Sequence, residues 1–268
     1  MVTIDGTNKF FGRVSTGKYP MSVDEIGRGF SEHNELQETI SRWRSHRAEL
    51  IEHGNGPVKL TRDVTMLFDV IPADSFAQGI LRESWRMSEQ EKSQVYVPHQ
   101  GTSTMYNADG FLRFASTGTQ SEAFGYTQLF RSGIVEYADG FCCNPPPGGG
   151  HPMILGQELE KQMVQCYEDA INRFRRLGRS GVFYVDFSLI GIAGRAIFAI
   201  LMSTVFGQHL IRQNIFSSPE VLVDINEPEE SPYGRTLLPL VDTMWQVGGR
   251  EGIPFKPKGV WNPFGLYQ

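Results

Sequence analysis

Two nearly uninterrupted apolar runs constrain the fold most, because each is long enough for one strand and neither has a polar face. Residues 64–71 read Val-Thr-Met-Leu-Phe-Asp-Val-Ile and stop before Pro72, and residues 182–190 read Val-Phe-Tyr-Val-Asp-Phe-Ser-Leu-Ile. Strands that are buried on both faces lose the alternation of apolar and polar residues. The sequence therefore predicts two central strands, each with one carboxylate, Asp69 and Asp186, in an apolar setting.

Three segments have the apolar spacing of amphipathic helices. Residues 31–53 follow a possible N-cap, Ser31, and end before Gly54, while a separate short helix opens at residues 21–26. Arg47 interrupts the apolar stripe of the first long helix, so it must reach solvent or find a carboxylate. The second long helix covers residues 157–177 and the last covers roughly 236–247. Their expected buried stripes are Leu159, Met163, Cys166, Ala170, Phe174 and Leu177, and then Leu237, Leu240, Val241, Met244 and Trp245.

Short strands with tight turns are expected between residues 103 and 141. The turns at 107–110 and 131–133 both contain glycine between apolar segments, which is typical of β-hairpins. Further strands are expected at 193–198 and 215–225, and the polar segment 83–94 is expected at the surface. The fold class is therefore α+β, with a largely antiparallel sheet flanked by two long helices and a shorter C-terminal helix.

Charge and cysteine usage exclude some classes of function. The chain of 268 residues has a formal net charge of −5, so any binding of nucleic acid requires a local basic patch. No apolar stretch is long and continuous enough to span a bilayer, so no membrane association is expected. The three cysteines, Cys142, Cys143 and Cys166, have no zinc spacing and fit a reducing, cytoplasmic setting.

Asp69 and Asp186 are the candidate catalytic residues. If their strands are neighbours, the two carboxylates could form a metal or acid–base site, as in a metal-dependent nuclease or phosphohydrolase. The alternative is structural, because a buried carboxylate needs a partner. That partner could be a backbone N–H, Arg47, Arg195 or a tyrosine hydroxyl. The six histidines show no ligand spacing, so no metal site is assigned, and the residues do not identify a cofactor.

Two groups of arginines are candidate nucleic-acid contacts. Arg42 and Arg44 alternate with glutamates on the first long helix, a pattern that also suits a solvated, salt-bridged face. The second group consists of Arg173, Arg175, Arg176 and Arg179, which could instead complement the dipole at a helix C-terminus. The run Gly148, Gly149 and Gly150 precedes a helix and is a candidate anion site, although glycines after three prolines also suit a plain linker.

Several segments resemble the C-terminal region of bacterial Schlafen AlbA-like proteins, also called divergent AAA proteins. The start of the chain resembles the final strand and exit helix of the AlbA-like domain, through Phe-Phe-Gly-Arg at 10–13 and Gly-Lys-Tyr-Pro-Met-Ser at 17–22. The other segments that carry the resemblance lie at residues 67–76, 106–111, 125–133 and 240–245. The resemblance implies a remnant of that domain at 1–29, one α+β domain at 30–250 and an extended tail at 251–268.

The resemblance also implies a class of function. Family members are described as transcriptional regulators or as ATP- or DNA-binding proteins, and related Schlafen domains can be RNA nucleases. The nuclease carboxylates belong to the N-terminal domain, nearly all of which this sequence lacks, so no family active-site residue is carried over. The expected function is a non-catalytic accessory, sensor or binding module. Its partner would be a protein, the missing N-terminal domain, or nucleic acid held by a local basic patch.

Overall fold

The computed structural model describes residues 2–4, 7–9, 11–14, 17–20, 22–61, 63–77, 85–99, 103–118, 122–140, 143–144, 153–198, 209–226, 236–254 and 261. The chain divides into two compact units, residues 1–46 and residues 47–268. The division falls within a helix, whereas the sequence placed a domain boundary between residues 29 and 30. Each unit is described by itself.

The first unit consists of two small hairpins and most of a long helix. Strand β1 (Val2–Ile4) pairs with β2 (Thr7–Lys9), and β3 (Phe11–Val14) pairs with β4 (Gly17–Pro20), both antiparallel. Helix α1 runs from Val23 to Glu52 without a break, so the prediction of two helices with an N-cap at Ser31 was wrong. Glycines at 27 and 29 weaken a helix by about 1 kcal/mol each, but they keep their N–H donors and do not interrupt the hydrogen-bond ladder as proline would.

The second unit is built on a nine-stranded sheet. Its strand order is β15-β13-β6-β10-β9-β8-β7, with β16 also paired to β13 and β5 paired in parallel to β9. Every other pairing in this sheet is antiparallel, which confirms the predicted α+β class. The strands are β5 (Lys59–Leu60), β6 (Thr65–Pro72), β7 (Ser103–Tyr106), β8 (Gly110–Ser116), β9 (Glu122–Phe130), β10 (Val135–Asp139), β13 (Val182–Ile190), β15 (Ile215–Ser217) and β16 (Val221–Asp224).

Both predicted hairpin turns are present. In the β7–β8 turn, Asn107 Oδ1 accepts hydrogen bonds from the backbone N–H groups of Asp109 and Gly110, at 3.0 and 2.8 Å. In the β9–β10 turn, Gly133 has φ +91°, a conformation that glycine adopts without strain. A second, three-stranded sheet joins β11 (Cys143–Asn144), β12 (Met153–Leu155) and β14 (Ala196–Phe198).

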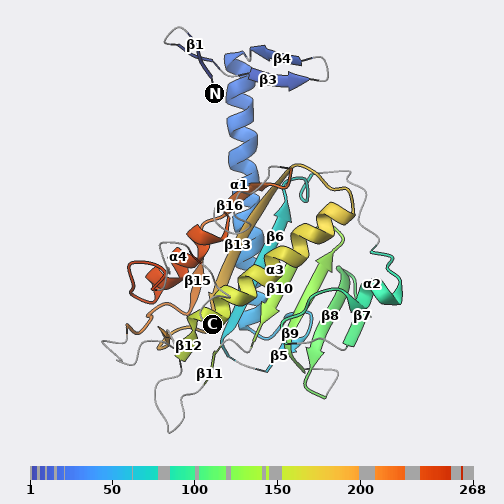
Figure 1. The fold of residues 1–268 in the computed structure, drawn as a ribbon, viewed down its shortest axis with the longest axis vertical. Helices are drawn as coiled ribbons and strands as arrows, with labels where there is room; N and C mark the ends of the chain where they lie inside the picture. Colours follow the sequence, from blue (N-terminus) through green and yellow to red (C-terminus); the bar gives the residue numbers. More distant parts are fainter. Residues whose placement is uncertain are drawn as a thin grey trace. The chain divides into compact units, whose positions relative to one another are not determined.

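One face of the large sheet packs against two helices and forms the main core. Figure 1 shows α3 (Gly156–Arg176) crossing this face, and α3 contacts both β6 and α4 (Leu237–Val247). A short helix, α2 (Glu89–Ser93), precedes β7. The predicted stripes of α3 and α4 are buried, with one exception: Leu177 is 50% exposed, because it is the C-cap and lies beyond the last helical turn.

Most of the described residues of the segment 83–94 lie at the surface as expected, but Trp85 does not. Trp85 is buried in the main core, and its Nε1 donates a hydrogen bond to the backbone oxygen of Phe130 at 2.7 Å. A buried indole is stable only when its N–H has a partner. The turn at the end of β9 supplies that partner, and nothing near Trp85 in the sequence indicates it.

Alternate residues of β6 face opposite sides of the sheet. Met66, Phe68 and Val70 belong to the main core beneath α3. Leu67 belongs to a second core, together with Ala48 from the end of α1 and Tyr126 from β9. Because side chains alternate along a strand, Asp69 points to the same face as Leu67.

Candidate functional site

Three buried carboxylates lie side by side across the centre of the sheet. Asp186 on β13 is directly opposite Asp69 on β6, and Asp69 is directly opposite Glu136 on β10. Side chains of directly opposite residues share a face, with their Cβ atoms about 4.5–5.5 Å apart. Each of the three residues is at most 1% exposed. The sequence thus identified two members of this carboxylate row (Asp186, Asp69 and Glu136) and missed the third.

Arg47 and Tyr126 bind the third carboxylate. Arg47 donates from Nε to Glu136 Oε2 and from Nη2 to Glu136 Oε1, both at 2.7 Å, and the Tyr126 hydroxyl donates to Oε1 at 2.7 Å. The guanidinium also lies over the ring of Phe130, 5.2 Å from its centroid. The sequence predicted that Arg47, which interrupts the apolar stripe of its helix, would reach solvent or pair with a carboxylate. It pairs with the carboxylate of Glu136.

The electrostatics of this group keep Arg47 charged. Burial opposes the charge of Arg47, but the attraction of Glu136 and the hydrogen bonds to it outweigh burial and raise the pKa of Arg47. Burial, and then the negative charge of Glu136, raise the pKa of the Tyr126 hydroxyl well above its usual value, so it remains a donor. Asp69 has a smaller effect in the same direction on the pKa of both groups.

The carboxylate row is closed to solvent. Neither Asp69 nor Asp186 lines any of the surface hollows described below. Within the described ranges, no group of three or more His, Cys, Asp or Glu side chains is arranged to hold a metal ion. Arg195, which the sequence offered as a partner for these aspartates, lines a hollow elsewhere in the unit. A substrate would need an opening of the sheet domain to reach either aspartate.

The candidate arginines do not form one surface. Arg42 is exposed on α1, where its Nε contacts the backbone oxygen of Glu38, whereas Arg44 is 5% exposed. Arg173 is also buried, and its guanidinium binds Asp169 at 3.1 Å, so it is not available to a ligand at the surface. Arg175 and Arg176 are exposed in the last turn of α3. The glycines Gly148, Gly149 and Gly150 lie outside the described residues.

Two further arginines lie at the β9–β10 turn. Arg131 lies in this turn, and its Nε donates to the oxygen of Ala108 at 3.1 Å. Arg179 follows α3 and pairs with Asp74 at 3.0 Å, and its Nη2 lies 3.1 Å from where a Cβ on Gly133 would be.

Arg86 is exposed and directly follows Trp85, which is bonded to the same turn. We call the five residues of this surface the basic end: Arg86, Arg131, Arg175, Arg176 and Arg179. Four acidic residues, Asp74, Asp109, Glu91 and Asp169, also lie here, and the last of them is paired with Arg173.

A second polar cluster lies on the α3 face of the sheet. The Tyr137 hydroxyl donates to Asp169 Oδ2 at 2.7 Å, and the Tyr96 hydroxyl donates to Gln165 Oε1 at 2.7 Å. At the edge of this cluster His99 Nε2 lies 2.7 Å from Asp139 Oδ1 at the end of β10. Burial opposes the charge of His99, but the hydrogen bond and the charge of Asp139, with that of Glu158, outweigh it and raise the pKa of His99.

The raised pKa of His99 predicts a pH-dependent contribution to stability. A group whose pKa is higher in the folded state stabilises the fold fully below its unfolded pKa, about 6.5 for histidine. That contribution is lost as the pH rises through the folded pKa. Urea unfolding of the wild type and of His99→Gln should therefore differ most at acidic pH and converge as the pH is raised. A difference that grows with pH would contradict this assignment.

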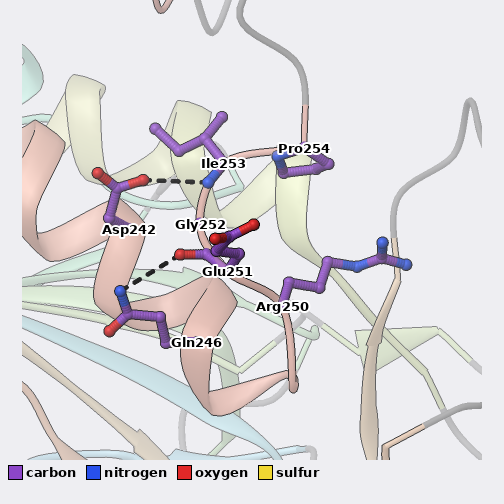
Figure 2. Close-up of a pocket in the computed structure, with 7 residues that line it drawn as sticks. All are labelled: Asp242, Gln246, Arg250, Glu251, Gly252, Ile253 and Pro254. Atoms are coloured by element: carbon purple, nitrogen blue, oxygen red, sulfur yellow. Dashed lines mark hydrogen bonds between the residues drawn. The ribbon is translucent and has the colours of Figure 1, made fainter.

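A hollow beside α4 is occupied by contacts within its own loop. Figure 2 shows Asp242 Oδ1 accepting a hydrogen bond from the N–H of Ile253 at 3.0 Å, and Gln246 Nε2 lying 3.5 Å from the backbone oxygen of Glu251. Arg250 lies over the ring of Trp245, 6.0 Å from its centroid. These contacts fix the segment after α4 against the helix, so they account for the polar residues of this hollow.

Comparison with family models, with curated proteins and with solved structures finds no match to this chain. Over the described ranges, no helix is both long enough and apolar enough to cross a lipid bilayer.

Proposed function

We propose that this chain is a non-catalytic binding module of a cytoplasmic AlbA/Schlafen-like protein, and that nucleic acid binds at its basic end. The family assignment rests on the sequence resemblance. The ligand class rests on one observation, the convergence of Arg86, Arg131 and Arg179 with the end of α3 in a protein whose overall charge is negative. A positive surface of this kind neutralises phosphates without reading sequence.

The end of α3 provides the contacts at the centre of this surface. Arg175 and Arg176 line a shallow hollow together with Asp169 and Asn172. Both arginines are exposed, and no described carboxylate lies within ion-pair distance of either one. Guanidinium groups of this kind can each bind a phosphate through two N–H donors.

Replacing both exposed arginines, Arg175→Ala with Arg176→Ala, is expected to weaken binding of a short labelled oligouridine about tenfold or more at low salt. Loss of two phosphate contacts should also reduce the slope of log affinity against log salt by about 1.4, at about 0.7 per contact for single strands. The measurement is fluorescence anisotropy at several salt concentrations. Duplex DNA in a parallel titration shows whether the surface prefers single strands.

Arg212 supplies the matched control. It is an exposed arginine in the segment before β15, at the opposite end of β13 from the basic end. Arg212→Ala should therefore leave both affinity and salt slope unchanged. Equal effects of the two variants would refute the proposed surface. If the wild type binds no nucleic acid, the ligand class proposed here is wrong, and a protein partner becomes the alternative for this binding module.

The geometry of the carboxylate row favours one second candidate, a metal-dependent nuclease or phosphohydrolase. Asp69 and Asp186 lie directly opposite each other on neighbouring strands, as a shared metal site would require. Their burial argues for the structural role instead, because water and substrate must both reach a hydrolytic centre. A non-catalytic module is therefore the preferred proposal.

A further inference from the structure

A pocket of about 400 Å³ opens on the second unit, at the end of the large sheet opposite the basic end. Its walls come from the end of α1, from β5, from the start of β6 and from the turn after β13. The polar side chains that line it are Glu52, Lys59, Asp63, Arg195 and Asn214. Its volume lies within the range of about 300–1,000 Å³ that is usual for small-molecule sites.

Two of its four charged side chains already have partners. Lys59 Nζ pairs with Glu122 Oε1 at 3.1 Å, outside the pocket lining. Glu52 Oε1 accepts a hydrogen bond from Asn214 Nδ2, a contact that joins the end of α1 to the segment before β15. Lys59 is paired with a carboxylate outside the lining, whereas Glu52 keeps its negative charge because asparagine is neutral, so the lining retains one cation and two anions.

Among the described residues, Arg195 is the cation of the lining that has no ion pair, and Asp63 is the carboxylate of the lining that has neither an ion pair nor a hydrogen-bond partner. The Nε of Arg195 is buried, and it has no hydrogen-bond partner in the part of the chain that the structure describes. Asp63 is exposed and forms no ion pair with any described residue, including Arg195. The side chain of Arg195 as a whole is only half-buried, and no described residue pairs with the rest of its guanidinium, which is therefore the part that a ligand could contact.

The turn that carries Arg195 is held in place before any ligand binds. Gly191 has φ +75°, and a Cβ there would lie 1.8 Å from the backbone oxygen of Asp63, so only glycine allows this close approach. Ile211 N donates to Arg195 O at 2.9 Å, and Gly194 N donates to Ile211 O at 2.8 Å. The two unpaired charges therefore sit on backbone that is fixed on both sides.

We propose that this pocket binds a free α-amino acid, with its carboxylate on Arg195 and its ammonium group near Asp63. An arginine fork matches a carboxylate through paired N–H donors, and the carboxylate of Asp63 complements an ammonium group. One cation, Arg195, and two carboxylates, Asp63 and Glu52, line the same pocket without forming an ion pair with one another, which fits a ligand that carries both charges. This pocket is separate from the basic end, so the proposal of an amino-acid site does not depend on whether nucleic acid binds at the basic end.

The test is isothermal titration calorimetry of the full chain with a panel of the common L-amino acids. At least one should bind saturably with one-to-one stoichiometry. Its α-amide, which lacks the carboxylate charge, and its N-acetyl derivative, which lacks the ammonium charge, should each bind at least tenfold more weakly. Arg195→Gln should abolish binding, because the amide cannot replace the charged fork. Ala193→Phe places a large side chain at an exposed position of the pocket lining and should also block binding. Arg212→Gln should bind as the wild type does.

Three results would overturn the proposal. They are no saturable binding of any amino acid to the wild type, equal binding of the singly charged analogues, and unchanged binding in both pocket variants. Circular dichroism of each variant establishes that it is folded before titration. Because the two substitutions lie at different positions on the pocket wall, misfolding of one leaves the other to decide the outcome.

Discussion

Replacing Arg47 by methionine is expected to lower the free energy of unfolding by about 3–5 kcal/mol, because it strands a buried carboxylate. Glu136 is fully buried and receives two of its three hydrogen bonds from this guanidinium. Methionine fills a similar volume but offers no charge and no donor. Urea denaturation followed by circular dichroism measures the loss.

Two controls separate the buried charge from lost packing. The double variant, Arg47→Met with Glu136→Leu, should regain most of the loss, since replacing a buried ion pair by apolar residues is often neutral. Lys59→Met removes the exposed pair with Glu122 and should cost less than about 1 kcal/mol. If Arg47→Met lowers the free energy of unfolding no more than Lys59→Met does, then Arg47 does not stabilise the carboxylate row.

Phe174→Ala is the second substitution with a large expected effect, about 3–5 kcal/mol of unfolding free energy. Phe174 is completely buried on the inner face of α3, and its ring centroid lies 4.6 Å from that of Phe183 on β13. Truncation would leave a cavity between the helix and the sheet. Thermal and urea unfolding should both report the loss.

Leu177→Ala is the matched control for this position. Leu177 lies one turn further along the chain, but it is 50% exposed, so its truncation should change stability by about 0.5 kcal/mol or less. Similar losses for the two variants would show that the buried face of α3 has been assigned incorrectly.

Local patterns in the sequence predicted most of the elements correctly. The continuous apolar runs correspond to β6 and β13, and the glycine-containing turns lie in hairpins. The segments with 3.6-residue spacing correspond to α3 and α4. Leu177 was misplaced because periodicity does not show where the last turn ends. The break expected near Ser31 is absent, because a possible cap does not end a helix whose hydrogen-bond ladder can continue.

The site was predicted only in part, because its partners come from distant segments. Asp69 and Asp186 stood out as lone carboxylates in apolar runs. Glu136 did not, since it lies in a short strand where alternate polar residues are ordinary, and its pairing with Arg47 joins residues 89 positions apart. The basic end likewise needed the fold, because only the tertiary structure brings Arg179 to the β9–β10 turn, which carries Arg131 and to which Trp85, the neighbour of Arg86, is bonded.

We infer that the carboxylate row supports the fold, and we propose that the basic end binds nucleic acid. The most direct test incubates the wild type and Asp69→Asn with labelled RNA and DNA, with and without Mg²⁺ or Mn²⁺, and measures binding and cleavage in the same samples. Both proteins should bind, provided that Asp69→Asn remains folded, and neither should cleave the nucleic acid above background. Metal-dependent cleavage by the wild type that is lost in a folded Asp69→Asn variant would contradict this expectation.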